Sequence, residues 1–209
     1  MMDVIVVTGG IGSGKSEVCS ILQNQYGCGV YEADSRVKAL YVTHPTLLSD
    51  IEDALDEKFR DNQGRFVPQM LSRRIFADRK ALEEVEKLIF PALIEDFEHW
   101  KQAYADDRFI IFESATILEK PYFKGFGDKT ILIDAPYEIR LERACCRDGS
   151  SRESVSARMS NQDLMNQISE GKVAPDVDAI IYNYDGVDEL RHQIVLTINE
   201  LYGNKTDIN

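Results

Sequence analysis

The sequence lacks the features that mark membrane proteins and metal-binding proteins. Its longest apolar runs are about four or five residues, whereas a membrane-spanning helix needs roughly 20. Its four cysteines, Cys19, Cys28, Cys145 and Cys146, do not have the paired spacing of a metal site. Adjacent Cys145 and Cys146 are typical of a reduced, cytosolic protein. We therefore expect no membrane span, no structural metal and no catalytic cysteine.

Basic residues are also in short supply. Lys and Arg total 24 against 36 Asp and Glu, which gives a net charge of -12. Such a surface repels nucleic acids and anionic membranes, so we expect neither as a partner. The N-terminal segment carries Asp3 and then a glycine-rich stretch rather than a signal peptide, so we expect a cytoplasmic protein. An anionic substrate then needs a local cluster of basic residues.

The residues that are present predict an α/β protein. Five short runs rich in Val, Ile, Phe or Tyr read as strands that are covered on both faces. They are residues 4–7, 30–32, 109–112, 130–133 and 179–182. Helical patterns lie between them, for example at 16–25 and 190–201. This alternation indicates a doubly wound sheet within one domain, 1–209.

A long helical stretch separates the second and third predicted strands. It is too long for a simple crossover, and we interpret it as a helical insert over about 41–104. The core is then 1–40 and 105–209. Asp61-Asn62-Gln63-Gly64 predicts a turn within the insert, and Pro91 predicts a kink in its long helix.

The most specific motif follows the first strand. It matches the phosphate-loop pattern G-x-x-x-x-G-K-[ST] at every fixed position, and a helix is predicted directly after it. It reads Gly9-Gly10-Ile11-Gly12-Ser13-Gly14-Lys15-Ser16. The alternative, a chance glycine-rich turn, fits this context poorly. The motif predicts binding of a nucleoside triphosphate.

The chemistry of each position supports that prediction. Glycines allow successive N–H groups to point inward as an anion nest, and the following helix adds its dipole. Lys15 is expected to reach the β- and γ-phosphates, and the Ser16 hydroxyl to bind Mg²⁺. Glu17 follows directly, and we include it in the nucleotide site.

Two acids are candidates for roles on the acceptor side. Asp34 follows the second strand, where a carboxylate can take the proton of an acceptor hydroxyl. Its alternatives are a helix N-cap or a surface acid. Glu113 ends the third strand and could hold Mg²⁺ through water or contact the substrate. It could equally be a helix cap or a buried ion-pair partner.

Basic residues gather after the fourth strand. Arg140, Arg143 and Arg147 share one helical face, and Arg152 and Arg158 follow a flexible segment. A lid over about 147–172 that closes on ATP could place such arginines on its phosphates. The alternative is a solvated helix face paired with Glu138 and Glu142.

At these residues the chain resembles the dephospho-CoA kinase family, which carries out the last phosphorylation in coenzyme A synthesis. The segment 8–16 is similar to the family's phosphate loop word for word, and Glu32-Ala33-Asp34 stands where the family has Asp-Ala-Asp. The segments 113–119 and 178–183, together with Arg147-Asp148, Ser151-Arg152-Glu153, Arg158 and Gln162, also resemble the family. The resemblance spans nearly the whole chain in the right order.

The resemblance implies a five-stranded parallel sheet with a CoA-binding insert and a lid, and ATP, Mg²⁺ and dephospho-CoA as ligands. It implies that Asp34 acts as base and that Lys15 and Arg147 stabilise the transferred group. Arg143 and Arg152 would bind the nucleotide, and Arg73 and Arg74 the acceptor's phosphates. We expect a monomer or a weak homo-oligomer.

Some positions depart from the family. Phe90-Pro91 stands where members carry His-Pro, and Pro68 and Ser72 replace residues of Asn-Arg and Leu-Arg pairs. The segment from Gln162 to Asp178 is longer than usual. These departures keep two alternatives open: a P-loop kinase for another small acceptor, such as a nucleoside monophosphate or a sugar acid, and a non-catalytic nucleotide-dependent switch.

Overall fold

A parallel sheet of five strands lies at the centre of residues 2–32 and 104–203, one of two compact units of the chain. The computed structural model describes residues 2–174 and 176–203. The strands are β1 (Asp3–Thr8), β2 (Val30–Glu32), β3 (Phe109–Glu113), β4 (Lys129–Asp134) and β5 (Ala179–Tyr182). They stand in the order β2-β3-β1-β4-β5, and every neighbouring pair is parallel. The predicted α/β fold and its five strands are confirmed.

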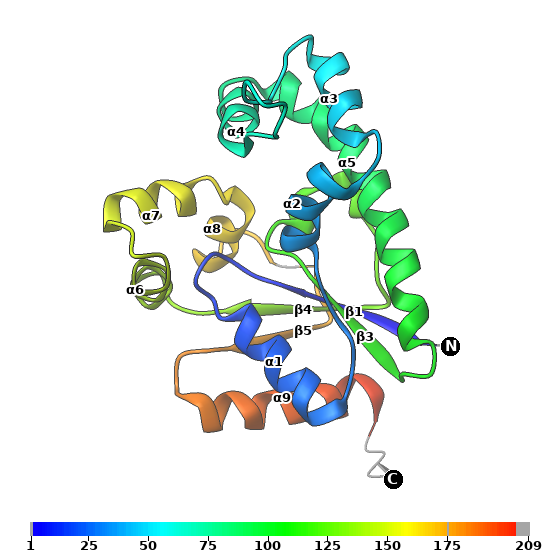
Figure 1. Ribbon diagram of the computed structural model, residues 1–209. Coiled ribbons are helices and arrows are strands. Elements are labelled where there is room, and N and C mark those ends of the chain that lie inside the picture. Colours follow the sequence, from blue (N-terminus) through cyan, green and yellow to red (C-terminus); the bar gives the residue numbers. More distant parts are fainter. Residues whose placement is uncertain (1, 175, 204–209) are drawn as a thin grey trace. The chain divides into compact units, whose positions relative to one another are not determined.

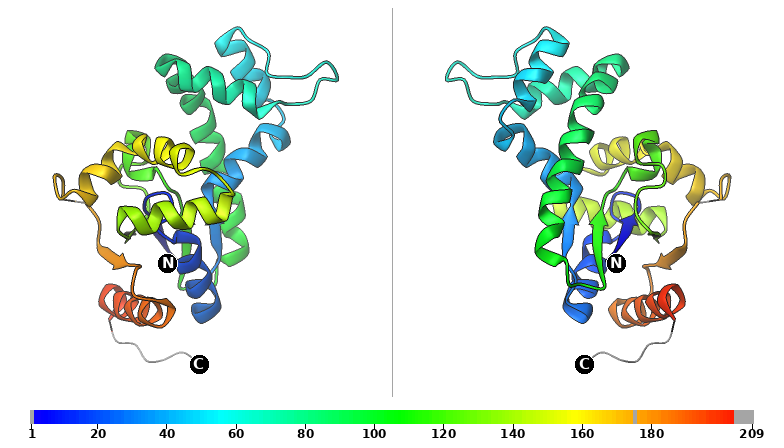
Figure 2. Two further views of the ribbon diagram at one scale, coloured as in Figure 1. Left: turned by 90° about the vertical axis from the view of Figure 1, so that its left-hand side faces the viewer. Right: turned by 90° about the vertical axis from the view of Figure 1, so that its right-hand side faces the viewer.

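One face of the sheet packs against α1 (Lys15–Tyr26) and α9 (Val187–Tyr202), which lie side by side below the strands in Figures 1 and 2. Alternate strand residues point to this face because side chains of a strand alternate between its two sides. They pack with helix residues in a continuous apolar core that includes Ile5, Val7, Ile111, Ile133, Leu22 and Ile194. This core fixes the start of α1 against the carboxyl end of β1.

The opposite face carries an aromatic cluster. Tyr31 of β2 stacks on Phe112 of β3 at 5.3 Å between ring centroids. Phe126 meets the same Phe112 ring edge-on at 4.7 Å, and Phe123 lies 6.3 Å away. The connection that supplies these rings contains two short 3₁₀ turns, η2 (Ile117–Glu119) and η3 (Pro121–Phe123). Aromatic side chains thus cover part of this face of the sheet.

Three helices lie between β4 and β5: α6 (Tyr137–Asp148), α7 (Arg152–Ser160) and α8 (Asp163–Ser169). The side chain of Ser151 caps α7 by accepting from the N–H of Ser154. Leu141 and Ala144 of α6 pack with Val155 and Met159 of α7 in a small buried cluster. The helices α7 and α8 fall within the segment that the sequence predicts as a lid.

The second compact unit, residues 33–103, is helical. Its helices are α2 (Ala33–Thr43), α3 (Leu47–Leu55), α4 (Pro68–Ala77) and α5 (Arg79–Trp100), and the 3₁₀ turn η1 (Lys101–Tyr104) follows. The Arg36 guanidinium of α2 donates two hydrogen bonds, of 2.7 and 2.8 Å, to the Asp96 carboxylate of α5. The helix α5 continues through Pro91. The unit begins eight residues before the predicted insert because it includes the whole of α2.

The predicted turn at residues 61–64 is present. The N–H of Gly64 donates to the carbonyl of Asp61 at 2.9 Å, and the Asp61 carboxylate accepts from the N–H groups of Gln63 and Arg65. Gly64 has a φ of +77°, a conformation that glycine adopts without strain.

Truncation of the buried core is expected to destabilise the protein. Ile194 of α9 is 0% exposed, so Ile194→Ala should cost about 2–5 kcal/mol of unfolding free energy through lost burial and a cavity. Leu196 on the same helix is 46% exposed, and Leu196→Ala should change it by less than about 0.5 kcal/mol. Urea denaturation measures both. Equal losses in the two variants would contradict this assignment of the core.

Candidate active site

The phosphate-loop motif forms a tight turn between β1 and α1. The N–H of Ser13 donates to the carbonyl of Gly10 at 3.1 Å, and the N–H of Val18 donates to that of Gly14 at 3.1 Å. Gly12 and Gly14 have φ values of +76° and +95°, which side chains disfavour. The strand, loop and helix thus follow each other as the motif predicts.

Lys15 bends back over this loop. Its ammonium donates to the carbonyl of Gly9 at 3.0 Å and lies 3.4 Å from that of Gly10. The Glu113 carboxylate lies 3.7 Å from the same nitrogen, and only about a tenth of either side chain is exposed. Glu113 ends β3 beside Val7 of β1, so the sheet itself brings the acid to the loop. Glu113 is therefore a buried ion-pair partner of Lys15, which is one of the alternatives that the sequence left open for it.

Asn183 holds the end of the loop. The side-chain amide of Asn183 donates to the backbone carbonyl of Ser13 at 2.9 Å. The backbone carbonyl of Asn183 accepts a hydrogen bond from the Arg143 guanidinium at 2.9 Å. The side chain packs so closely on Gly14 that a Cβ there would overlap it. Asn183 is 7% exposed. Sequence reasoning quoted this residue only as the end of a strand; its signal is a polar side chain directly after β5.

Gln162 holds the middle of the loop. Its side-chain carbonyl accepts from the N–H of Ile11 at 2.8 Å, although 151 positions separate the two residues. The Ile11 side chain packs on the cluster formed by α6 and α7. The loop is therefore attached to the helices between β4 and β5 by both a hydrogen bond and an apolar contact.

The arginines after β4 have different environments. Arg143 donates a hydrogen bond to Asn183, which in turn binds the phosphate loop. Arg140 is buried and packs directly against the glycines of the loop. The other three pair with carboxylates at the surface: Arg147 with Asp148 at 2.7 Å, Arg158 with Asp148 at 2.6 Å and Arg152 with Glu138 at 2.6 Å. Hydrogen bonds from Arg147 and Arg158 hold the pKa of the Asp148 carboxyl far below its usual range. The helical face predicted to be shared by Arg140, Arg143 and Arg147 is thus divided between the interior and the solvent.

The exposed candidates lie at helix starts and on α4. Ser16 and Glu17 are exposed in the first turn of α1, and Asp34 is exposed in the first turn of α2. In α4, Arg73 is exposed. Its neighbour Arg74 is bound to Asp78 at 2.7 Å and to Glu57 at 3.2 Å.

The cysteines near the sheet are poor nucleophiles. Burial, and next to it the Glu113 carboxylate, raise the pKa of the Cys19 thiol far above its usual range. Burial also raises the pKa of Cys28 to about 11. Both thiols stay protonated near neutral pH, and a thiol reacts through its thiolate.

The described part of the chain shows neither a metal-binding cluster nor a membrane-spanning helix. Among residues 2–174 and 176–203, no group of three or more His, Cys, Asp or Glu side chains is arranged to hold a metal ion. Within the same residues, no helix has the length and apolar character that crossing a membrane requires.

Comparison with solved structures defines the class of protein. A Thermus thermophilus protein, TT1252, superposes with a TM-score of 0.80 at 23% identity over 96% of this chain and 98% of its own. Dephospho-CoA kinase from Campylobacter jejuni gives a TM-score of 0.62 at 23% identity, with 96% and 98% covered. Shikimate kinase from Bacteroides thetaiotaomicron gives 0.53 at 10% identity over the same shares. These likenesses show that the chain has the α/β fold of these kinases, and the phosphate loop lies within it.

Sequence comparison gives the family. A family model described as dephospho-CoA kinase matches residues 3–189. Dephospho-CoA kinase of Porphyromonas gingivalis is 39% identical over 169 residues, which are 81% of this chain and 82% of that protein. The Bacteroides fragilis (strain YCH46) enzyme is 31% identical over 95% of this chain and 92% of its own. The chain belongs to the dephospho-CoA kinase family.

The close packing behind the loop generates a prediction. Gly12 and Gly64 have nearly the same φ, +76° and +77°, but a Cβ on Gly12 would overlap the Arg140 carbonyl whereas Gly64 has open space around it. Both alanine variants should lose about 1–2 kcal/mol of stability from the left-handed backbone. Only Gly12→Ala should also weaken ATP binding, by about 100-fold, because the loop must move. Titration calorimetry measures the binding, and unchanged ATP affinity in Gly12→Ala would contradict the role of this contact.

Proposed function

We propose that the protein transfers the γ-phosphoryl group of ATP to the 3′-hydroxyl of dephospho-CoA, giving coenzyme A and ADP. In this reaction the bond from the β,γ-bridging oxygen to the γ-phosphorus breaks, a bond from the 3′-oxygen forms, and the hydroxyl proton leaves. Family membership supports the acceptor. The observation that carries the proposal is the phosphate loop with Lys15 and Glu113 at its centre.

The loop residues Gly9 to Ser16 are proposed to bind the triphosphate. Their backbone N–H groups and the α1 dipole favour an anion. In the structure the Lys15 ammonium donates to two loop carbonyls, which are neutral acceptors. A charged β- or γ-phosphate oxygen would be a stronger acceptor and would take their place. We propose that Lys15 stabilises charge on the transferred group in this way. Glu17 lies exposed one residue beyond Ser16, at the rim of the same site.

Mg²⁺ is the cation we propose for the site. The exposed Ser16 hydroxyl fits as a ligand, and the Glu113 carboxylate beside Lys15 fits as an acid that holds the ion through water. Mg²⁺ keeps several waters and takes few protein ligands next to phosphates, so a larger cluster of acids is not required. When bound, the ion would neutralise phosphate charge.

Arg147 is proposed to act on the transferred group, and Arg143 and Arg152 on the nucleotide. Arg147 and Arg152 are 63% and 58% exposed and bound to Asp148 and Glu138. Exposed ion pairs contribute little free energy, so both guanidinium groups can exchange a carboxylate for a phosphate at small cost. Arg143 already lies at the loop through Asn183. The segment 147–172 would be the lid that makes this exchange.

Asp34 is proposed as the base for the acceptor hydroxyl. It stands two residues beyond Glu32, which is in register with Glu113 at the carboxyl end of the sheet. Ligands of such sheets bind at that end. In the helical unit 33–103, exposed Arg73 is the better candidate of the two α4 arginines for an acceptor phosphate, because Arg74 already holds two carboxylates.

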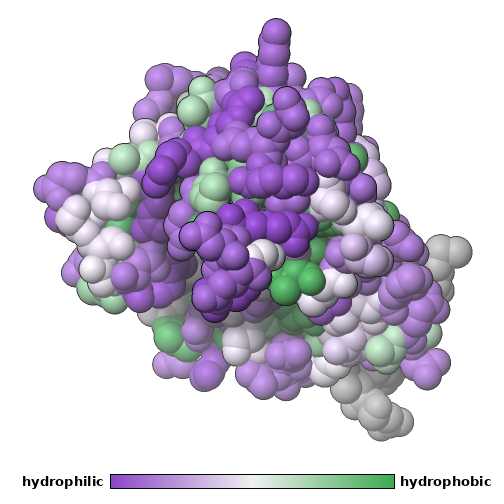
Figure 3. Space-filling model, turned by 45° about the horizontal axis from the view of Figure 1, so that its top comes forward, coloured by the Kyte–Doolittle hydropathy of each residue, from purple (hydrophilic) through white to green (hydrophobic). Residues whose placement is uncertain are grey.

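We further propose that the protein works in the cytoplasm as a monomer or a weak homo-oligomer. The cysteines of the described chain are free, including adjacent Cys145 and Cys146, which suits a reducing compartment. On the face drawn in Figure 3, hydrophilic residues predominate and hydrophobic ones form small separate areas. A surface of that kind does not favour a large permanent interface.

An acceptor panel tests the proposed function. The purified protein, ATP and Mg²⁺ should release ADP rapidly only when dephospho-CoA is present, and the product should carry a 3′-phosphate. A nucleoside monophosphate and a sugar acid serve as competing acceptors. Preference for either would support a kinase with another acceptor, and ATP binding without turnover on any acceptor would indicate a nucleotide-dependent switch.

Removal of the proposed base is expected to act on chemistry rather than on ATP binding. Asp34→Asn should lower kcat by about 10²–10⁴-fold, because the amide cannot take the hydroxyl proton. ATP affinity should stay within about twofold of the unaltered protein if the base acts only on the acceptor. Asp188→Asn is the matched control, since Asp188 is also exposed in the first turn of a helix. Equal activity of Asp34→Asn and Asp188→Asn would show that Asp34 is not the base.

Loss of the loop lysine is expected to affect the transfer step most strongly. Lys15→Ala removes the positive charge that faces the developing negative charge, and should lower kcat by about 10²–10³-fold. Lys129→Ala is the control, because Lys129 is paired with Asp178 at the start of β4, whereas the phosphate loop lies at the carboxyl end of the sheet. Single-turnover kinetics separate transfer from product release. Near-normal transfer by Lys15→Ala would refute its role.

A further inference from the structure

Arg140 lies in an unusual place for a charged residue. It is 2% exposed and stands in the first turns of α6, directly behind the phosphate loop. Its guanidinium packs on Gly10 so closely that a Cβ at this glycine would overlap it, and its backbone carbonyl packs on Gly12 in the same way. The two glycines therefore allow a buried positive group to reach the back of the loop.

The guanidinium is not neutralised by a direct partner. Among the side chains that the structure describes, which do not include those of residues 163 and 169, no ion pair or hydrogen bond to this guanidinium is found, and its Nε is buried without a hydrogen-bond partner. The Tyr137 ring centroid lies 6.0 Å from it. Burial lowers the pKa of Arg140 although Asp134 and Tyr137 attract its charge. A buried charge without a partner is costly, so a benefit elsewhere must offset it.

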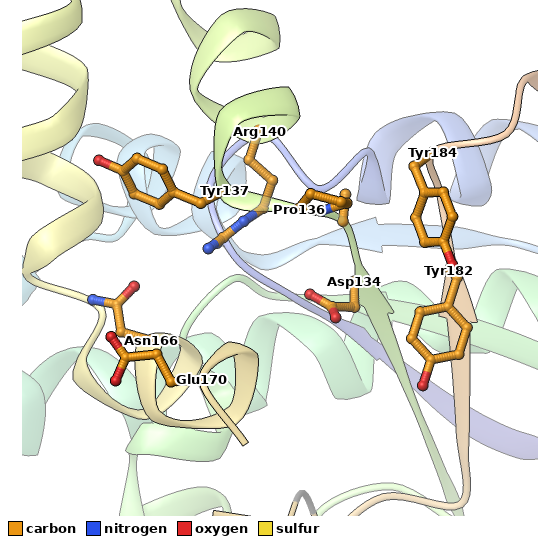
Figure 4. Close-up of a pocket in the computed structure, with 9 residues that line it drawn as sticks. Asp134, Pro136, Tyr137, Arg140, Asn166, Glu170, Tyr182 and Tyr184 are labelled. Carbon is orange, nitrogen blue, oxygen red and sulfur yellow. The ribbon is translucent and has the colours of Figure 1, made fainter. Parts of the chain in front are cut away.

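The guanidinium borders a pocket of about 500 Å³ whose lining includes Asp134, Tyr137, Asn166 and Glu170. Figure 4 shows these side chains, and the carboxylates of Asp134 and Glu170 carry the negative charges of the lining. The two carboxylates make the pocket itself unattractive to an anion. A strong negative charge can instead approach from the other side of Gly10, where the phosphate loop faces its ligand.

We propose that Arg140 is an electrostatic positioning residue for the triphosphate: it holds a fixed positive charge behind residues 10–12, and ATP in the loop is its counter-charge. The inference rests on ATP binding at the loop. Arg140 does not touch the phosphates. It acts across one layer of backbone, in a water-poor region where charges interact more strongly than in water.

This role and a purely structural role predict opposite effects of removing Arg140 on the stability of the free protein. If the charge serves ligand binding, its removal relieves an unfavourable burial in the free protein and weakens only the anionic complex. If Arg140 instead braces the loop, its removal destabilises the free protein. Thermal stability without ligand and the affinity for ligands of increasing charge therefore separate the two.

The test compares Arg140→Met, which keeps the length of the side chain without charge, with Arg140→Lys, which keeps a charge without the planar group. Arg140→Met should leave the Tm of the free protein unchanged or higher. It should weaken ATP binding about tenfold and ADP binding less, and leave adenosine binding unchanged, because the effect follows ligand charge. Arg140→Lys should recover most of the ATP affinity. Arg191→Met, on an exposed arginine of α9, controls for net charge.

Several results would overturn the proposal. They are a lower Tm or failed folding of Arg140→Met, unchanged ATP affinity, equal losses for ATP and adenosine, or an Arg140→Lys variant as weak as Arg140→Met. Failure of the unaltered protein to bind ATP would instead refute the proposed function. The two failures are therefore distinguishable.

Discussion

The close approach of neighbouring groups to the glycines of the phosphate loop is the constraint on which the rest of the site depends. Gly10, Gly12 and Gly14 each lie where a Cβ would overlap a neighbour: the Arg140 guanidinium, the Arg140 carbonyl and the Asn183 amide. The loop is thus shaped from behind by residues that follow it by more than 120 positions. A shape fixed before the ligand arrives leaves little reorganisation for phosphate binding.

Much of the fold could be predicted because its signals are local. Each strand is a short apolar run, and the central strands β1, β3 and β4 are largely buried on both faces as such runs imply. The edge strands β2 and β5 end in exposed residues, Glu32 and Tyr182. The phosphate loop is a contiguous motif, and the turn at Asp61 is determined by four adjacent residues. The same holds for α1, which stops at Gly27 with φ +68°. Local chemistry decides such elements, so one sequence suffices.

The rest of the site depends on contacts between distant positions. Ile11 and Gln162 are 151 positions apart, and Ser13 and Asn183 are 170 positions apart. No local sequence pattern predicts hydrogen bonds over such separations. Spacing on a helix placed Arg140, Arg143 and Arg147 on one face, but spacing does not say how deep each side chain lies. Only packing against the loop shows that Arg140 is buried while Arg147 reaches solvent.

The most direct test of the central claim is a crystal structure with ADP and Mg²⁺. We expect the β-phosphate to lie within hydrogen-bond distance of the backbone N–H groups of residues 12–16. We also expect the Lys15 ammonium to leave the Gly9 and Gly10 carbonyls for phosphate oxygen, while the backbone of residues 9–14 keeps its present shape. A nucleotide bound elsewhere with this loop empty, or a loop that refolds around the phosphate, would contradict the account.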